Sequence, residues 1–146
     1  MSDKPLRRVL LVDDEEHVTR ALERALRKEG YEISSVNDPR EALALLKTQA
    51  FDIVISDHLM PGMNGIDFTK LVRDRYPDML RIMLTGQPDT DMVIQAINHG
   101  EVYRFVKKPW NDLDLKCTLS FAFEHLDTVR EQRRTSAVVR RWNSIF

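Results

Sequence analysis

The stretch IVISDHLMPGMNG, Ile53 to Gly65, has the pattern of a buried strand followed by that of a sharp turn. Its apolar run is short and nearly continuous, which is typical of a parallel strand covered on both faces. The run ends on one carboxylate, Asp57, and the loop that follows contains a proline and two glycines, which are turn residues. Two interpretations are open here, because such a loop serves equally to leave a sheet or to hold Asp57 as a reactive group.

The same alternation of strand and helix patterns runs through most of the chain. Between the short apolar runs, apolar residues recur at the three- and four-residue spacing of a helix. Because each crossover between parallel strands needs a helix and keeps one handedness, this order predicts an α/β domain with a parallel sheet. The predicted strands span residues 8–12, 31–36, 51–56, 80–84 and 102–106, and the predicted helices span 18–26, 39–46, 66–76, 88–98 and a last one from 112.

The composition indicates one folded domain with a tail. Of the 146 residues, 42% are hydrophobic and 31% are charged, so the chain can bury a core and is not disordered by composition. A net charge of −1 gives no excess of positive charge, so we expect no nucleic acid partner within this chain. Cys117 is the single cysteine, which excludes an internal disulfide and a cysteine-rich zinc site.

The sequence predicts no membrane segment. The start, MSDKPLRR, lacks the apolar core of a signal peptide, and no later apolar run is long enough to span a bilayer. We therefore expect a cytoplasmic protein that does not bind a membrane.

The last helix is predicted to extend beyond the domain. After Val129 the sequence turns basic, and it then carries apolar residues that nothing obvious covers, namely Val138, Val139, Trp142, Ile145 and Phe146. We expect a domain over residues 7–126 and an extended C-terminal helix or linker over 127–146. This end is the predicted linker to an output domain outside this chain, or the interface of a homodimer.

Chemically useful side chains follow the predicted strands. The carboxyl ends of parallel strands meet at one edge of a sheet, so these side chains should lie together. They are Asp13 and Asp14 after the first strand, Asp57 after the third, Thr85 after the fourth and Lys108 after the fifth. Carboxylates so close raise one another's pKa unless a cation joins them. Magnesium suits this need, because it takes hard oxygen ligands and is commonly held by carboxylates beside a phosphate.

Asp57 is the predicted nucleophile of this group. It stands alone at its strand end, whereas Asp13 and Asp14 are paired and better suited to a metal ion and its bound water. With the metal and Lys108 neutralising the phosphoryl oxygens, Asp57 can attack phosphorus in line and become an aspartyl phosphate. The Thr85 hydroxyl can then donate a hydrogen bond to the new phosphoryl group.

Four motifs carry a resemblance to a known family. They are VDDE at residues 12–15, DHLMPGMNG at 57–65, LTG at 84–86 and FVKKP at 105–109. In this order and spacing the chain resembles the receiver domain of bacterial two-component response regulators, the CheY-like domains, from Arg7 to Leu126. The resemblance implies a flavodoxin-like, doubly wound sheet of five parallel strands in the order 2-1-3-4-5, with five helices.

The resemblance also implies roles for single residues. Asp57 accepts a phosphoryl group from a histidine kinase or a histidine phosphotransfer protein. Magnesium is held by Asp13, Asp14, Asp57 and the main-chain carbonyl of Leu59, and Lys108 binds the phosphate. The implied protein is a signalling module and not an enzyme.

The resemblance also implies a conformational switch and a cis peptide bond. Thr85 moves toward the phosphoryl group and Phe105 turns inward to fill the vacated space, while a cis bond between Lys108 and Pro109 aims the lysine. The segment GEVYRFVKKPW, residues 100–110, further resembles receivers joined to cyclic-di-GMP phosphodiesterase outputs or to hydrogenase-type transcription activators. Leu59 and Gln87 occupy positions that modulate dephosphorylation in the family, and neither is a water-positioning acid, which favours a long-lived phosphoryl state.

Simpler structural roles and two further protein classes compete with the signalling function. Asp13 and Asp14 could simply cap the first helix, Thr85 could be an ordinary strand-end hydroxyl, and Phe105 could be a core residue. A hydrolase with an aspartyl-phosphate intermediate would need a second acid two residues after the nucleophile, where Leu59 stands. A nucleotide-binding protein would need a glycine-rich loop after the first strand, where the chain instead has four consecutive acids at 13–16.

Overall fold

The computed structural model describes residues 7–86 and 89–145, and these form two compact units. The first unit ends at Lys116 and the second begins at Cys117, and each is described by itself. The elements in chain order are β1 Arg8–Val12, α1 Glu16–Leu26, the short 3₁₀ turn η1 Arg27–Glu29, β2 Glu32–Val36, α2 Pro39–Leu46, β3 Ile53–Asp57, α3 Gly65–Arg75, β4 Leu80–Thr85, α4 Thr90–Asn98, β5 Arg104–Lys107 and α5 Asp112–Ile145.

The sheet confirms the predicted topology. Its five strands are all parallel and follow the order β2-β1-β3-β4-β5. The register pairs Val12 with Ser56 and Thr85 with Lys107, so the central strands and β5 end nearly level with one another. All residues that follow these strand ends are therefore delivered to one edge of the sheet.

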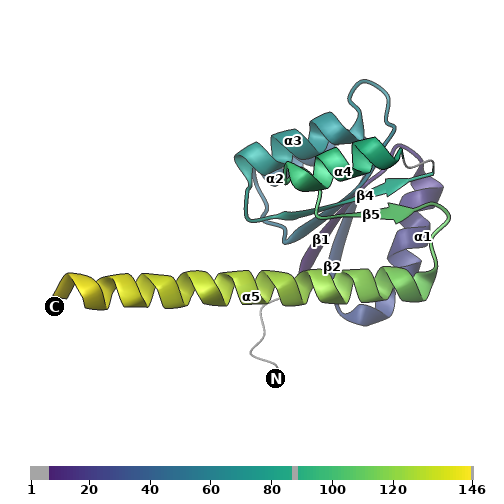
Figure 1. Ribbon diagram of the computed structural model, residues 1–146. Helices are drawn as coiled ribbons and strands as arrows, with labels where there is room; N and C mark the ends of the chain where they lie inside the picture. Colours follow the sequence, from purple (N-terminus) through teal and green to yellow (C-terminus); the bar gives the residue numbers. More distant parts are fainter. Residues whose placement is uncertain (1–6, 87–88, 146) are drawn as a thin grey trace. The chain divides into compact units, whose positions relative to one another are not determined.

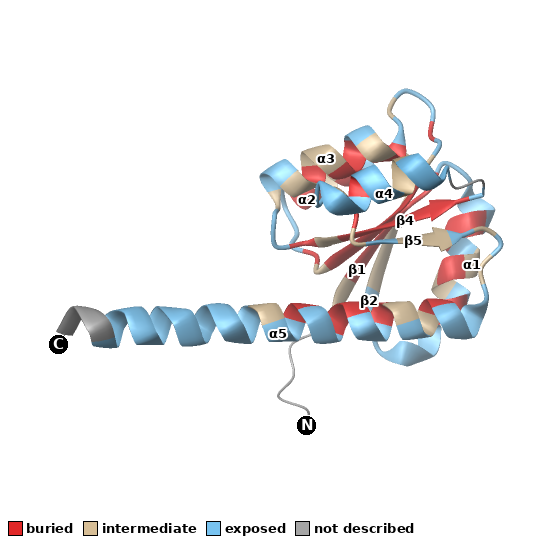
Figure 2. Ribbon diagram, in the orientation of Figure 1, coloured by how far each residue is buried: buried red, intermediate tan, exposed pale blue. Residues whose placement is uncertain are grey.

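Helices cover both faces of the sheet. In Figure 1, α2, α3 and α4 lie over one face and α1 lies on the other. Since side chains alternate along a strand, Leu10 and Val12 of β1 join the core under α2 and α3, while Val9 and Leu11 point the opposite way. The strands β1, β3 and β4 are buried along most of their length, as Figure 2 shows, which explains their nearly continuous apolar runs.

Local signals explain where the helices begin. Asp38 caps α2 by accepting a hydrogen bond from the Arg40 amide, with proline at the first helical position, as the sequence predicts. Asn64 caps α3 through the Asp67 amide at 2.8 Å. The strand β1 has the predicted bounds, and the other strands differ from the prediction by one or two residues at one or both ends. The strands β3 and β5 begin two residues later than predicted, because Phe51 and Val102 fill the core without joining the ladder. The predicted α4 start at Pro88, and Gln87 before it, lie outside the described residues.

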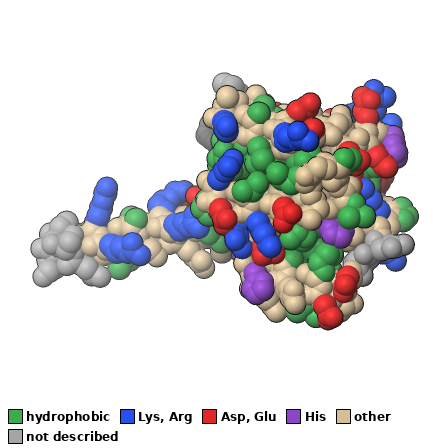
Figure 3. Space-filling view, turned by 90° about the horizontal axis from the view of Figure 1, so that it is seen from above, with side chains coloured by type: hydrophobic (Ala, Val, Ile, Leu, Met, Phe, Trp, Pro, Cys, Tyr) green, Lys and Arg blue, Asp and Glu red, His purple; other side chains and the backbone are tan. Residues whose placement is uncertain are grey.

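The long last helix is also confirmed. It is continuous over 34 residues, from Asp112 to Ile145. Its apolar stripe is buried at Leu119, Ala122, Phe123 and Leu126, whereas every residue from 130 to 142 is exposed, as Figure 2 shows. Arginines are frequent on this exposed part, and Figure 3 shows the basic side chains along it. Among the described residues, no helix has the length and apolar character needed to cross a bilayer.

Candidate functional site

The ammonium group of Lys108 joins two strand ends that are far apart in the chain. Its Nζ donates to Oδ2 of Asp13 at 3.0 Å and to Oδ1 of Asp57 at 2.8 Å, across 95 and 51 residues of sequence. The loop after β5 brings it there, and the Lys108 amide donates to the Thr85 carbonyl at 2.8 Å. The predicted convergence of the first, third and fifth strand ends is therefore present in the structure.

Neighbouring main-chain groups hold the two carboxylates in place. Oδ1 of Asp13 accepts from the Glu15 amide at 2.9 Å, and Oδ1 of Asp57 accepts from the His58 amide at 2.9 Å. The side chain of Asn37 donates to the Asp13 carbonyl at 2.8 Å and ties the end of β1 to the end of β2. The N-cap of α1 is Glu15, so Asp13 is engaged at the sheet edge and does not cap the helix.

Burial and charge act against each other in this site. Asp13 is fully buried, and desolvation raises its pKa, although the Glu15 amide and Lys108 favour its charged form and the nearby Asp57 opposes it. For Lys108, burial disfavours the charge, but hydrogen bonds from Nζ to Asp57 and Asp13 outweigh it, so its pKa is raised. Lys108 therefore remains a cation at neutral pH.

The acidic cluster, defined as Asp13, Asp14 and Asp57, has the donors that magnesium prefers. Each residue offers a carboxylate oxygen, and these oxygens lie within 4.8 Å of one another. When ionised, three carboxylates and the one ammonium of Lys108 leave a formal charge of −2, which a divalent cation balances. The residues present thus fit a magnesium ion.

A cleft of about 480 Å³ opens beside the acidic cluster. Thr85 is buried at its wall, and Leu59 lies at its rim with 71% of its surface exposed. The complete lining comprises Asp14, Glu15, Asp57, His58, Leu59, Thr85, Gly86 and Lys108. Every catalytic or metal residue predicted from the sequence thus lines this cleft, except Asp13, which is hydrogen-bonded to Lys108 in the cleft.

Gly65 has a role that the turn interpretation missed. Its amide donates to the His58 carbonyl at 2.8 Å, which closes the loop after β3. A Cβ atom at this position would overlap the Asp57 carbonyl oxygen and lie 2.9 Å from the Cα of His58. A side chain here would therefore displace the main chain that carries Asp57, and glycine is required by close approach.

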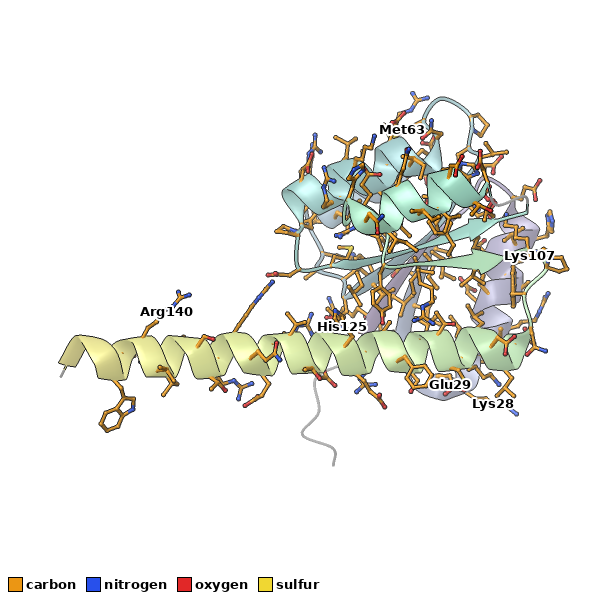
Figure 4. The ribbon with its side chains drawn as sticks, in the orientation of Figure 1. Lys28, Glu29, Met63, Lys107, His125 and Arg140 are labelled. Atoms are coloured by element: carbon orange, nitrogen blue, oxygen red, sulfur yellow. The ribbon has the colours of Figure 1, made fainter. Side chains whose placement is uncertain are left out.

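Two adjacent lysines at the end of β5 have different surroundings. Lys107 is the last residue of β5 and is exposed, as Figure 4 shows at its label, whereas Lys108 reaches the acidic cluster. The peptide bond between Lys108 and Pro109 is cis, as expected. Phe105 is half-buried and packs against Met83 and the other residues of a small core cluster under α4.

Comparison with known proteins now shows the family. The sequence pattern of the response regulator receiver domain matches residues 9–120, and this chain belongs to that family. It is 39% identical over 110 residues to the hydrogenase transcriptional regulatory protein HoxA of Cupriavidus necator, covering 75% of this chain and 22% of HoxA. It is 38% identical over 102 residues to the C4-dicarboxylate transport transcriptional regulatory protein DctD of Rhizobium meliloti, covering 70% of this chain and 22% of DctD. The chain thus spans about a fifth of these two relatives.

Solved receiver structures share the fold. The signal receiver domain of an HD domain-containing protein from Pseudomonas fluorescens Pf-5 has a TM-score of 0.82 at 36% identity, covering 90% of this chain and 96% of that one. The beryllofluoride-activated NtrC4 receiver domain dimer has a TM-score of 0.76 at 34% identity, covering 82% and 98%. Receiver domains are signalling domains that histidine kinases phosphorylate, so the class of this protein follows from both sequence and fold.

Proposed function

We propose that Asp57 is the phosphoacceptor of this receiver and takes its phosphoryl group from a phosphohistidine. The observation that carries the proposal is the single ammonium of Lys108 within hydrogen-bond distance of both Asp13 and Asp57. Oδ1 of Asp57 already accepts from Lys108 and from the His58 amide, so its second oxygen is the attacking atom.

The transfer requires one bond to form and one to break. The Asp57 oxygen attacks phosphorus in line, the bond from phosphorus to the donor imidazole nitrogen breaks, and the histidine leaves with the electron pair. Asp13, Asp14, Asp57 and the Leu59 carbonyl would hold Mg²⁺, whose charge offsets that of the phosphoryl oxygens. Lys108 is already beside Asp57 and contributes a second positive charge to the same oxygens.

The phosphorylated state is read through a switch. The Thr85 hydroxyl lines the cleft beside Asp57 and donates to the phosphoryl group, and Phe105 moves into the space that Thr85 leaves. Phosphate acts only through its differential affinity for the switched arrangement. The face that changes includes α4, on which Ile94 and Ile97 are exposed; Figure 3 looks onto this side and shows hydrophobic side chains among charged ones.

The lifetime of the phosphoryl group follows from what surrounds it. Leu59 replaces the second acid of a hydrolase with an exposed apolar side chain, so no carboxylate activates water from that position. We therefore propose a long-lived aspartyl phosphate and a signalling module in place of a turnover enzyme.

The output is proposed to lie beyond this chain, in the cytoplasm. HoxA and DctD are transcriptional regulators by name, and the receiver from Pseudomonas fluorescens belongs to an HD domain-containing protein. We propose a receiver over residues 7–126 that passes its state through the extended C-terminal helix or linker over 127–146 to such an output. The exposed Val138, Val139 and Trp142 supply an apolar surface for a homodimer on this helix.

Phosphorylation by a small donor tests the nucleophile. Incubation with Mg²⁺ and phosphoramidate should add one acid-labile phosphoryl group, measured by intact-mass spectrometry, and Asp57→Asn should remove it because an amide cannot form the acyl phosphate. Asp67→Asn, an exposed aspartate on α3, is the matched control and should label like the parent. Equal labelling of Asp57→Asn would refute the assignment.

Truncation after Leu126 tests the dimer. If the helix beyond this residue mediates assembly, the full chain should be a dimer and the truncated chain a monomer in light scattering. A monomer in both forms would refute the homodimer.

A further inference from the structure

Arg81 is a buried cation that the phosphorylation chemistry does not use. It lies on β4 with 7% of its surface exposed. Its guanidinium donates to three main-chain carbonyls, those of Met79 at 2.7 Å, Gly100 at 2.8 Å and Glu101 at 2.9 Å. Hydrogen bonds from a charged donor are about twice as strong as neutral ones, and the planar fork of arginine suits several acceptors at once.

The position of Arg81 on β4 relates it to the site. Alternate residues of a strand share a face, so Arg81, Met83 and Thr85 form one row on the side that α4 covers. Met83 packs against Ala96 in the middle of α4. Arg81 binds the turn at the C-terminal end of that helix, and Thr85 stands at the opposite end of the row, in the cleft.

Further contacts hold the same end of α4. Arg73 on α3 donates to the His99 carbonyl at 3.3 Å, and its guanidinium lies 3.8 Å from a carboxylate oxygen of Glu101. Lys70 lies at 3.8 Å from the same oxygen. At the N-terminal end, the helix is capped from within by Asp89, which accepts from the Asp91 amide at 3.0 Å. The two ends of α4 are thus held by different kinds of contact.

We propose that Arg81 is a positioning residue that anchors the C-terminal end of α4 to the sheet, so that phosphorylation displaces only the end of the helix beside Thr85. This inference rests on the proposed function of Asp57 and Thr85. Because main-chain carbonyls keep their partial charge whatever happens at Asp57, the anchor is unaffected by the phosphoryl group. The movement of Thr85 toward the phosphoryl group is then converted into a tilt of α4 about its fixed end.

Hydrogen exchange followed by mass spectrometry can resolve the two ends of α4. The full chain is compared with Mg²⁺ alone and with Mg²⁺ plus beryllofluoride, whose binding is followed by ¹⁹F NMR. In the parent protein, beryllofluoride should change exchange in residues 89–94 by about threefold or more and leave residues 97–102 within about 1.5-fold. In Arg81→Met, and to a smaller extent in Arg81→Lys, the change should extend to residues 97–102.

The change in hydrogen exchange between Mg²⁺ alone and Mg²⁺ plus beryllofluoride distinguishes an anchoring role of Arg81 from a general contribution to stability. A merely structural role for Arg81 would raise exchange in both conditions and leave the beryllofluoride effect confined to residues 89–94. Arg75→Met, which removes an exposed guanidinium from the end of α3, is the matched control and should keep the parent pattern. If Arg81→Met does not fold, Arg81→Lys and the parent pattern still decide the matter.

Three results would overturn the inference. Equal changes at both ends of α4 in the parent, no change in α4 despite a bound ¹⁹F signal, or an unaltered pattern in both Arg81 variants would each refute the anchor and leave the function of Asp57 standing. Absence of a bound ¹⁹F signal in the parent would instead refute the proposed function, and the anchor with it.

Discussion

Lys108 and Arg81 are both cations withdrawn from solvent, and they are held at opposite edges of the sheet by different partners. Lys108 lies between two carboxylates at the carboxyl edge, with 22% of its side chain exposed. Arg81 lies near the amino end of β4 and donates to three main-chain carbonyls, with 7% of its surface exposed. One has partners that can change charge, and the other has partners that cannot.

This difference separates the reactive edge from the supporting edge. A carboxylate can take up a proton or bind a cation, and in the proposed function Asp57 also accepts a phosphoryl group, so the contacts of Lys108 can be exchanged. A carbonyl group has no such alternatives, so the contacts of Arg81 are lost only when the turn after α4 moves. Among the described residues, no buried side-chain nitrogen or oxygen lacks a hydrogen-bond partner, so neither cation has a buried nitrogen without one.

The largest expected effect is on stability, and it should differ between the two edges. Arg81→Met leaves three carbonyls without their donor, and we expect a loss of about 3 kcal/mol in the free energy of unfolding. Lys108→Met leaves Asp57 at the open cleft, where it can be solvated, and leaves the buried Asp13, which can take up a proton, and we expect a loss of about 1 kcal/mol. Urea unfolding in a metal-free buffer measures both, with Arg75→Met as the unperturbed reference. Equal losses would remove the contrast between the edges.

Magnesium affinity should depend on the carboxyl edge alone. Asp14→Ala removes an exposed member of the acidic cluster, and we expect Mg²⁺ binding to weaken by at least about tenfold in calorimetric titration. Arg81→Lys should bind Mg²⁺ like the parent, because it lies at the other edge. Unchanged affinity in Asp14→Ala would refute the metal role of that residue.

The smallest expected effect is a pH dependence that belongs to Asp13. The pKa of this carboxyl group is raised above its ordinary value of 3.8, chiefly by burial. Between the unfolded and folded values the folded protein binds more protons, so the free energy of unfolding falls as pH rises through that interval. Lys108 stays charged there and adds no slope.

Urea unfolding with a chelator at about pH 4 to 7 should reveal this slope. In Asp13→Asn the fall in the free energy of unfolding with rising pH should be smaller, so the variant gains stability relative to the parent as pH rises. Parallel profiles for the two proteins would contradict the assignment to Asp13.

Much of the fold could be predicted because its signals are local. A continuous apolar run such as residues 53–56 is readable as a buried strand, and proline after Asp38 is readable as a helix start, since each depends on a few neighbouring residues. The strand ends likewise point to the acids and the lysine, because parallel strands share one edge. The predicted boundaries differ from the observed ones by a residue or two, because Phe51 and Val102 serve the core without pairing.

The amino-acid sequence by itself determined the order of elements, the residues delivered to the reactive edge and the family to which the chain belongs, because periodicity, turn chemistry and motif spacing are short-range properties. Only the tertiary structure decided that Lys108 lies between two particular carboxylates, that Gly65 must lack a side chain beneath Asp57, and that Arg81 binds the turn after α4. Those facts depend on distances between residues remote in the chain. Such distances exist only once the helices are packed on the sheet.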